Sequence, residues 1–149
     1  MNEQQTASAG DIALAIVLFG VTVITAVYWV VWYLVPGGEQ MLSVLPGDAA
    51  HKRFEDAFLA ADAWMAIASL IAGLRLLRAP ARAAGWLYMA GSAGLYLAGM
   101  DILYDVQNGI YGLAANPEQR SAVITEIVIN VGTVLFSVVA IARARRISP

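Results

Sequence analysis

Four long runs of apolar residues alternate with shorter polar segments along the chain. The runs cover about residues 11–35, 54–77, 84–106 and 121–142. Each is close to the roughly 20 residues that a helix needs to cross a bilayer core of about 30 Å. The pattern therefore predicts an all-α, polytopic membrane protein with one domain over 1–149, an antiparallel bundle of four transmembrane helices.

The connections between the runs contain turn signals. The first, PGGEQMLSVLPGD, has two Pro-Gly turns around the apolar segment MLSVL, which predicts a short interfacial segment in this loop. Asp48 is placed to cap the start of the second helix. The second connection, LLRAPARAAG, is short, so the second and third helices are expected to be antiparallel neighbours.

The positions of the basic residues indicate an orientation. Arg75, Arg78 and Arg82 flank the second connection, and three more arginines, Arg143, Arg145 and Arg146, follow the fourth run. The opposite side has only Lys52, Arg53 and Arg120. Because positively charged loops tend to stay in the cytoplasm, we expect a multi-pass membrane location with both termini cytoplasmic.

Composition narrows the class of protein further. Hydrophobic residues make up 60% of the chain and charged residues 13%, against about 25% charged in ordinary soluble domains. No lysine or arginine precedes the first run, so we expect it to be retained rather than cleaved as a signal peptide. The absence of cysteine excludes disulfide chemistry and thiolate metal sites. The net charge of −2 and the lack of a basic patch with aromatic residues give no indication of nucleic-acid binding.

Polar and small residues recur at helical spacing within each run, so each helix is expected to carry one polar face. The faces are Thr22, Thr25, Trp29 and Trp32 in the first helix; Glu55, Leu59, Asp62, Ala66, Ser69 and Gly73 in the second; Gly91, Gly94, Ala98, Asp101, Asp105, Asn108 and Gly112 in the third; and Glu126, Asn130, Thr133 and Ser137 in the fourth.

Two interpretations apply to these faces. Small residues and isolated hydroxyls commonly pack helices together in membranes, and acids near helix ends, such as Glu55, Asp56 and Asp105, can simply lie among lipid headgroups. Asp62, Asp101 and Glu126 are deeper, and no lysine or arginine lies at their depth in sequence. Unpaired carboxylates in such a place hold a proton, bind a cation or face water.

The aromatic residues suggest what kind of cation. Trp29 and Trp32 share a face with Thr22 and Thr25, and carboxylates opposite indoles suit an organic cation through charge pairing and cation–π attraction. We therefore predict a cavity in the outer half of the bundle. The residues predicted to bind the cation are Asp62, Asp101, Glu126, Asn130, Asp105, Asn108, Glu55, Trp29 and Trp32.

No cofactor or metal site is predicted. The single histidine, His51, lies beside Lys52 and Arg53 and is interpreted as a solvated surface residue. An all-carboxylate site can hold Ca²⁺ or Mg²⁺, but the chain lacks a compact Asp-rich loop. It also lacks a Ser-His or Cys-His pair for nucleophilic catalysis, which makes an enzyme the less favoured class.

The layout of four helices with both ends inside and an acid partway along the second helix resembles, in layout only, the emopamil-binding and sigma-2 receptor group, which binds sterols and amphipathic amines. The resemblance implies that such a bundle can form an amine-accepting pocket.

The predicted function is binding, with proton-coupled transport as an extension, of a cation or cationic amphipathic molecule from the bilayer. Two alternatives remain open: a membrane isomerase that uses the carboxylates as acid and base on a lipid-like substrate, and an accessory subunit. In the accessory role, the Gly91 and Gly94 face would contact a partner membrane protein or a second copy of the chain.

Overall fold

The computed structural model describes residues 6–148, which contain helices and connecting turns but no strand. The prediction of an all-α protein is therefore confirmed. The helical segments in chain order are α1 (Ala9–Leu34), α2 (Gly38–Leu42), α3 (Ala49–Arg78), the 3-10 helix η1 (Pro80–Arg82), α4 (Ala84–Gln107), the 3-10 helix η2 (Ile110–Ala115) and α5 (Arg120–Ile147).

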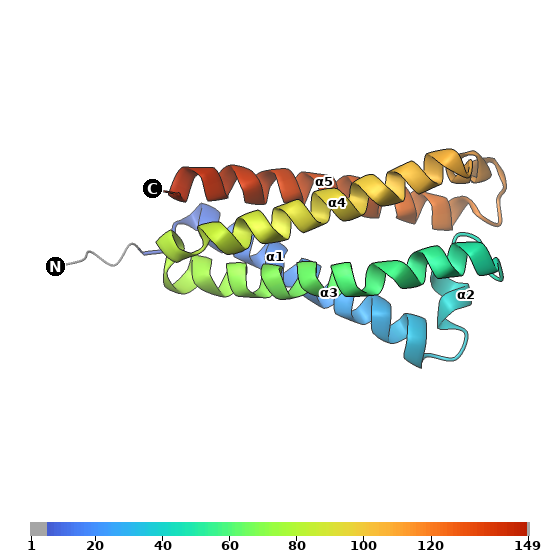
Figure 1. Cartoon of the computed structure of the whole chain (residues 1–149), viewed down its shortest axis with the longest axis horizontal. Coiled ribbons are helices and arrows are strands. Elements are labelled where there is room, and N and C mark those ends of the chain that lie inside the picture. The colour runs from blue at the N-terminus through green and yellow to red at the C-terminus, as the bar shows by residue number, and fades with distance from the viewer. Residues whose placement is uncertain (1–5, 149) are drawn as a thin grey trace.

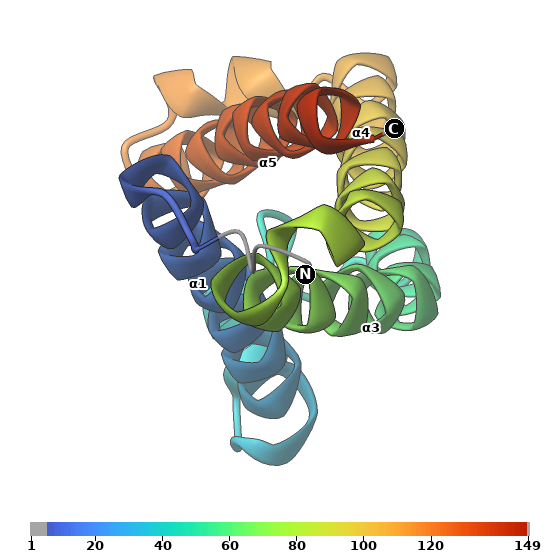
Figure 2. The same cartoon turned by 90° about the vertical axis from the view of Figure 1, so that its left-hand side faces the viewer.

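Four long helices, α1, α3, α4 and α5, run along the long axis of the molecule (Figure 1). α1 packs closely on α3, α3 on α4 and α4 on α5, whereas α1 and α5 have few close backbone contacts. Viewed from the end, the four helices follow one another around the long axis (Figure 2). The start of α1, the α3–α4 connection and the end of α5 lie together at one end, and α2 and η2 lie at the other (Figure 1).

Three of the long helices, α1, α3 and α5, are long and apolar enough to cross a membrane, which indicates a membrane protein. α4 has 24 residues but does not join this group, because glycines, tyrosines and two aspartates dilute its apolar residues. The sequence predicted four membrane-spanning helices, and the hydropathy of the helices supports three of them.

The apolar core lies in the half of the molecule that contains the start of α1 and the end of α5 (Figure 1). Leu18, Leu76 and Leu87 are fully buried there, and alanines of α3, α4 and α5 fill the seams between these helices. Small side chains allow helices to approach closely, which increases dispersion contacts in the absence of a hydrophobic driving force. Toward the other end, α1 diverges from α5 (Figure 1), and the core stops at Met65, Leu97 and Phe136.

An ion pair connects α1 to α5 at the end where the core lies. Arg143 Nε donates to Asp11 Oδ1 at 2.7 Å, and Ser8 donates to the other oxygen of Asp11 through both its hydroxyl and its backbone N–H. Asp11 is only 2% exposed. The ion pair therefore supplies the positive charge that a buried carboxylate needs, and it holds the two helices together where their backbones are otherwise apart.

The loop between α1 and α3 is packed on the protein. Asp48 caps α3 as predicted, because its carboxylate accepts from the backbone N–H groups of Ala50 and His51. These two bonds, that of His51 first, hold the pKa of the Asp48 carboxyl below its ordinary value. The apolar segment predicted at the interface is divided, since Met41 is exposed while Val44 is buried against Ile110 and Val123.

Gly91 and Gly94 of α4 face α5 of the same chain. A Cβ on Gly91 would lie 2.8 Å from the backbone oxygen of Ser137, and one on Gly94 would meet the Ser137 hydroxyl and lie 2.9 Å from Phe136 Cε1. These glycines therefore allow α4 and α5 to pack within the chain, and this packing covers the surface that an accessory role would offer to a partner.

We expect Gly91→Ala to lower the free energy of unfolding by about 1–3 kcal/mol, because a backbone oxygen cannot move aside for the added methyl group. The measurement is unfolding of the detergent-solubilised protein by titration with a denaturing detergent. Gly99→Ala in the same helix is the matched control, since a Cβ there has no heavy atom within 4 Å. Equal stability of the two variants would contradict the close α4–α5 packing.

We expect Arg143→Met to lower the free energy of unfolding by about 1–3 kcal/mol, because it leaves the Asp11 carboxylate buried without its cation. Arg145→Met, at an exposed position in the same turn, is the control and is expected to be neutral. The double variant Asp11→Asn/Arg143→Met should cost less than the sum of its single changes. Additive costs would show that the pair does not join α1 to α5.

Candidate functional site

A cavity of about 540 Å³ lies among α1, α3, α4 and α5. Most of its lining is apolar, and none of the lining residues is a lysine or arginine. Its polar lining includes four carboxylic acids and one amide: Glu55, Asp62, Asp101, Glu126 and Asn130. The cavity is therefore mostly apolar, with several acidic side chains in its lining.

The acids reach the cavity because of their spacing along three helices. Glu55 and Asp62 are seven residues apart in α3 and point to one side, since seven residues are close to two helical turns. Glu126 and Asn130 are four residues apart in α5, and Asp101 comes from α4. All five side chains belong to the predicted polar faces, and the structure places them around one cavity.

Two aromatic side chains of α1 satisfy the acids of α3. Tyr28 donates its hydroxyl to Glu55 Oε2 at 3.1 Å, and Trp29 donates Nε1–H to Asp62 Oδ2 at 3.0 Å. In α5, the amide of Asn130 donates to Glu126 Oε1 at 3.3 Å. These bonds fix the orientation of three carboxyl groups without neutralising their charge.

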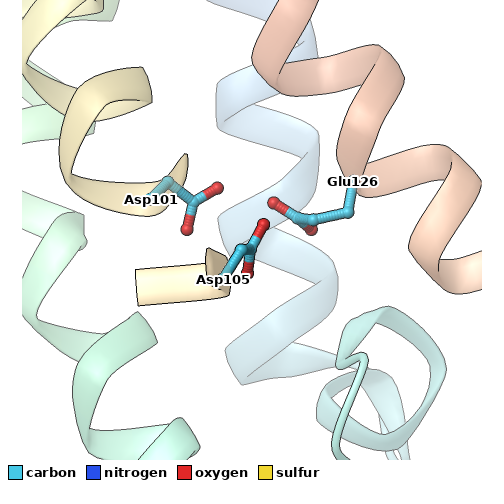
Figure 3. Close-up of side chains that lie close together, drawn as sticks. All are labelled: Asp101, Asp105 and Glu126. Carbon is cyan, nitrogen blue, oxygen red and sulfur yellow. The ribbon is translucent and has the colours of Figure 1, made fainter. Parts of the chain in front are cut away.

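Asp101, Asp105 and Glu126 form a close acidic cluster, with one oxygen from each within 4.8 Å of the others. Figure 3 shows Asp101 and Asp105 on α4 directed toward Glu126 on α5. Asp105 is 2% exposed, and its Oδ2 has no hydrogen-bond partner. None of the ion pairs among residues 6–148 includes a member of this cluster.

Four of the residues predicted to bind a cation do not line the cavity. Asp105 belongs to the acidic cluster but does not line the cavity. Asn108 is exposed at the end of α4 and donates to the backbone oxygen of Tyr104. Trp29 is buried beside Asp62, and Trp32 donates its indole N–H to Asp56 Oδ1 at 3.0 Å.

The ring of Trp32 does have a cation over it, and that cation belongs to the protein. Lys52 Nζ lies 5.3 Å from the ring centre of Trp32 and 5.7 Å from that of Tyr33. The same ammonium group pairs with Asp56 at 3.1 Å and with Glu39 at 3.5 Å. This aromatic site is therefore filled by Lys52 and is not part of the cavity.

The face of α1 toward the cavity differs from the predicted one by about one residue. The cavity is lined by Val21, Ile24, Thr25 and Tyr28, whereas Trp29 and Trp32 turn toward the acids of α3. One residue corresponds to a rotation of about 100° around a helix. The spacing of residues in the sequence therefore did not distinguish between two neighbouring faces of α1. The aromatic residues that line the cavity are Tyr28, Phe58 and Phe136.

His51 is not the solvated surface residue that the sequence suggested. It is 3% exposed, its Nε2 lies 3.7 Å from Glu55 Oε1, and its ring centre is 5.6 Å from that of Tyr104. Asp48 caps α3, so His51 lies in the first turn of this helix. The basic residues beside it in the sequence do not indicate that its side chain points into the protein. The imidazole therefore lies between α3 and α4 next to an acid of the cavity.

Comparisons with protein-family models, with curated proteins and with solved structures find no match for this chain. The case for its function therefore rests on the geometry and chemistry of the cavity.

We expect Trp29→Phe to lower the free energy of unfolding by about 1–3 kcal/mol, because it removes the donor to a half-buried acid, Asp62. The same change made in an Asp62→Leu background should cost less, since the acceptor is already gone. Trp64→Phe, at an indole that is 48% exposed, is the control in the same detergent unfolding titration. An identical cost of Trp29→Phe in both backgrounds would argue that only packing of the indole matters.

Proposed function

We propose that this protein is an integral membrane protein that binds a cationic amphipathic small molecule in the cavity among its four long helices. The main observation in its favour is the lining: Glu55, Asp62, Asp101 and Glu126 face a mostly apolar space without a lysine or arginine. A molecule with an apolar body and one positive group complements both parts of that lining.

The size and charge of the cavity support this class of ligand. Its volume of about 540 Å³ lies within the roughly 300–1,000 Å³ of small-molecule sites in proteins. Carboxylates in a medium of low dielectric attract a cation far more strongly than they do in water. Tyr28, which donates to Glu55, and Phe58 in the same lining add aromatic surface of the kind that organic ammonium ions favour.

The gap between α1 and α5 provides a route from the bilayer. The cavity is bordered there by Val17 and Ile24 of α1 and by Val128 and Ile129 of α5. These side chains are 47%, 67%, 64% and 45% exposed, in that order. An amphipathic cation dissolved in lipid can therefore enter between two helices that are not packed on each other. If the cation were released on the far side of the membrane, the protein would be a transporter, with release coupled to protonation of the acids.

In this proposal α4 also crosses the membrane, which completes an antiparallel bundle of four helices with both termini in the cytoplasm. α4 lies between α3 and α5 and packs closely on both, so its polar residues can face protein instead of lipid. Six arginines lie at the end of the molecule that contains the α3–α4 connection and the end of α5 (Figure 1), and they support the cytoplasmic assignment.

The test is binding of an aryl-alkyl trimethylammonium ion, 4-phenylbutyltrimethylammonium, to the purified protein in non-ionic detergent, measured by isothermal titration. We expect Asp62→Asn to weaken binding about tenfold, which corresponds to about 1.4 kcal/mol for one lost charge interaction. The asparagine can still accept from Trp29. Asp56→Asn is the matched control, since Asp56 is in the same helix but pairs with Lys52 outside the cavity.

A steric variant and a neutral ligand complete the test. Gly132 lines the cavity, and a Cβ there has open space around it, so Gly132→Phe should fold and block the cavity, whereas Gly99→Phe should not affect binding. The tert-butyl analogue of the ligand, with carbon in place of nitrogen, should bind much more weakly. Equal binding of the two ligands, or equal affinity in Asp62→Asn and Asp56→Asn, would refute the proposal.

A further inference from the structure

The acidic cluster of Asp101, Asp105 and Glu126 has a geometry that one ion can bridge. Asp101 and Asp105 are one helical turn apart on α4, and Glu126 approaches from α5 (Figure 3). One oxygen from each of the three lies within 4.8 Å of the others. Two oxygens bound to the same Ca²⁺ at about 2.4 Å can be up to about 4.8 Å apart, so all three can approach one ion with small side-chain adjustments.

The protein supplies no positive charge to this cluster. Arg143 and Lys52 pair with Asp11 and Asp56 elsewhere, and Asn130, which donates to Glu126, is an uncharged amide. A carboxylate taken out of water without a cation or donors costs several kcal/mol. The cluster is therefore incomplete as a set of protein groups.

Asp105 is the residue that points to a missing ligand. It does not line the cavity, it is 2% exposed, and its Oδ2 is buried without a hydrogen-bond partner. Buried polar atoms are nearly always partnered in folded proteins. An acid at the end of a helix that served only to contact headgroups or water would not be buried in this way.

We propose that Asp101, Asp105 and Glu126 bind one hard divalent cation, Ca²⁺ or Mg²⁺. Three carboxylates are the ligand type that these ions prefer, and both ions complete their coordination with water. The water has space, because Asp101 and Glu126 also face the cavity. Asn130 donates to Glu126 and so positions one ligand from outside the coordination sphere.

The ion joins α4 to α5 at the end of the molecule opposite the Asp11–Arg143 pair. It also separates the acids into two groups, since it neutralises most of the charge of the cluster and leaves Glu55 and Asp62 of α3 to face an organic cation. The metal site shares Asp101 and Glu126 with the cavity but also uses Asp105, which does not line it, so variants of Asp105 test the metal site separately from the proposed function.

The experiment measures thermal unfolding and direct binding on the full chain after chelator treatment, in non-ionic detergent. Added Ca²⁺ or Mg²⁺ should raise the unfolding temperature in proportion to the logarithm of its concentration, because only the folded state holds the three ligands together. Na⁺ at matched ionic strength should not. Equilibrium dialysis with the responding ion should give one site per chain.

Asp105→Asn is the decisive variant and should weaken ion binding at least about tenfold, since a charged ligand becomes neutral. It should leave the affinity for 4-phenylbutyltrimethylammonium within about threefold of wild type, which also shows that the variant is folded. Asp101→Asn should weaken ion binding as well. Glu118→Gln, at an exposed acid in the turn before α5, is the control and should bind the ion like wild type.

The outcomes separate this proposal from the preceding one. Loss of ion binding in Asp105→Asn with retention in Asp62→Asn supports the metal site, whether or not the organic cation binds. Lack of a stabilising effect of either divalent ion on the wild type overturns it. Equal ion affinity in wild type, Asp105→Asn and Asp101→Asn also overturns it, and would show that the ions bind only to scattered surface acids.

Discussion

The structure depends on how buried carboxyl groups are compensated in a molecule that is mostly apolar. Asp11 has Arg143 as its cation. Glu55 and Asp62 accept hydrogen bonds from aromatic side chains of α1. In the cluster of Asp101, Asp105 and Glu126, no carboxylate has an ion pair among the described residues, and Asp105 Oδ2 is buried without a hydrogen-bond partner. A carboxylate in a medium of low dielectric without a cation or hydrogen-bond donors costs free energy. The partner of each acid therefore distinguishes the acids that stabilise the fold from those that can bind a cation or a metal ion.

The cavity exists because helix packing is uneven. Glycines and alanines bring α4 against α5 and α3 against α4, whereas α1 follows α3 and diverges from α5 (Figure 1). The Asp11–Arg143 pair closes the gap at one end only. An opening bordered by exposed valine and isoleucine side chains is therefore left beside the acids, and it faces the surroundings that a bilayer would fill.

The sequence located the acids well but not their partners. The spacing of Glu55 and Asp62, of Asp101 and Asp105, and of Glu126 and Asn130 follows from the geometry of a single helix, and each pair does share a face. The rotation of α1 against α3 is a property of two packed helices. An error of one residue in that rotation moved Trp29 and Trp32 from the predicted cavity wall to hydrogen bonds with Asp62 and Asp56.

Residue spacing alone predicts that the chain is helical, that it carries long apolar segments, and that several acids fall where no basic residue is available at the same depth. These properties are periodic or local, and so they can be read from residue spacing. Three contacts become visible once the helices are packed: Lys52 lies over the ring of Trp32, His51 is buried, and Asp105 of α4 lies close to Glu126 of α5. Such contacts depend on how the helices cross and turn against one another, which is set by all the packed side chains together and not by any one segment.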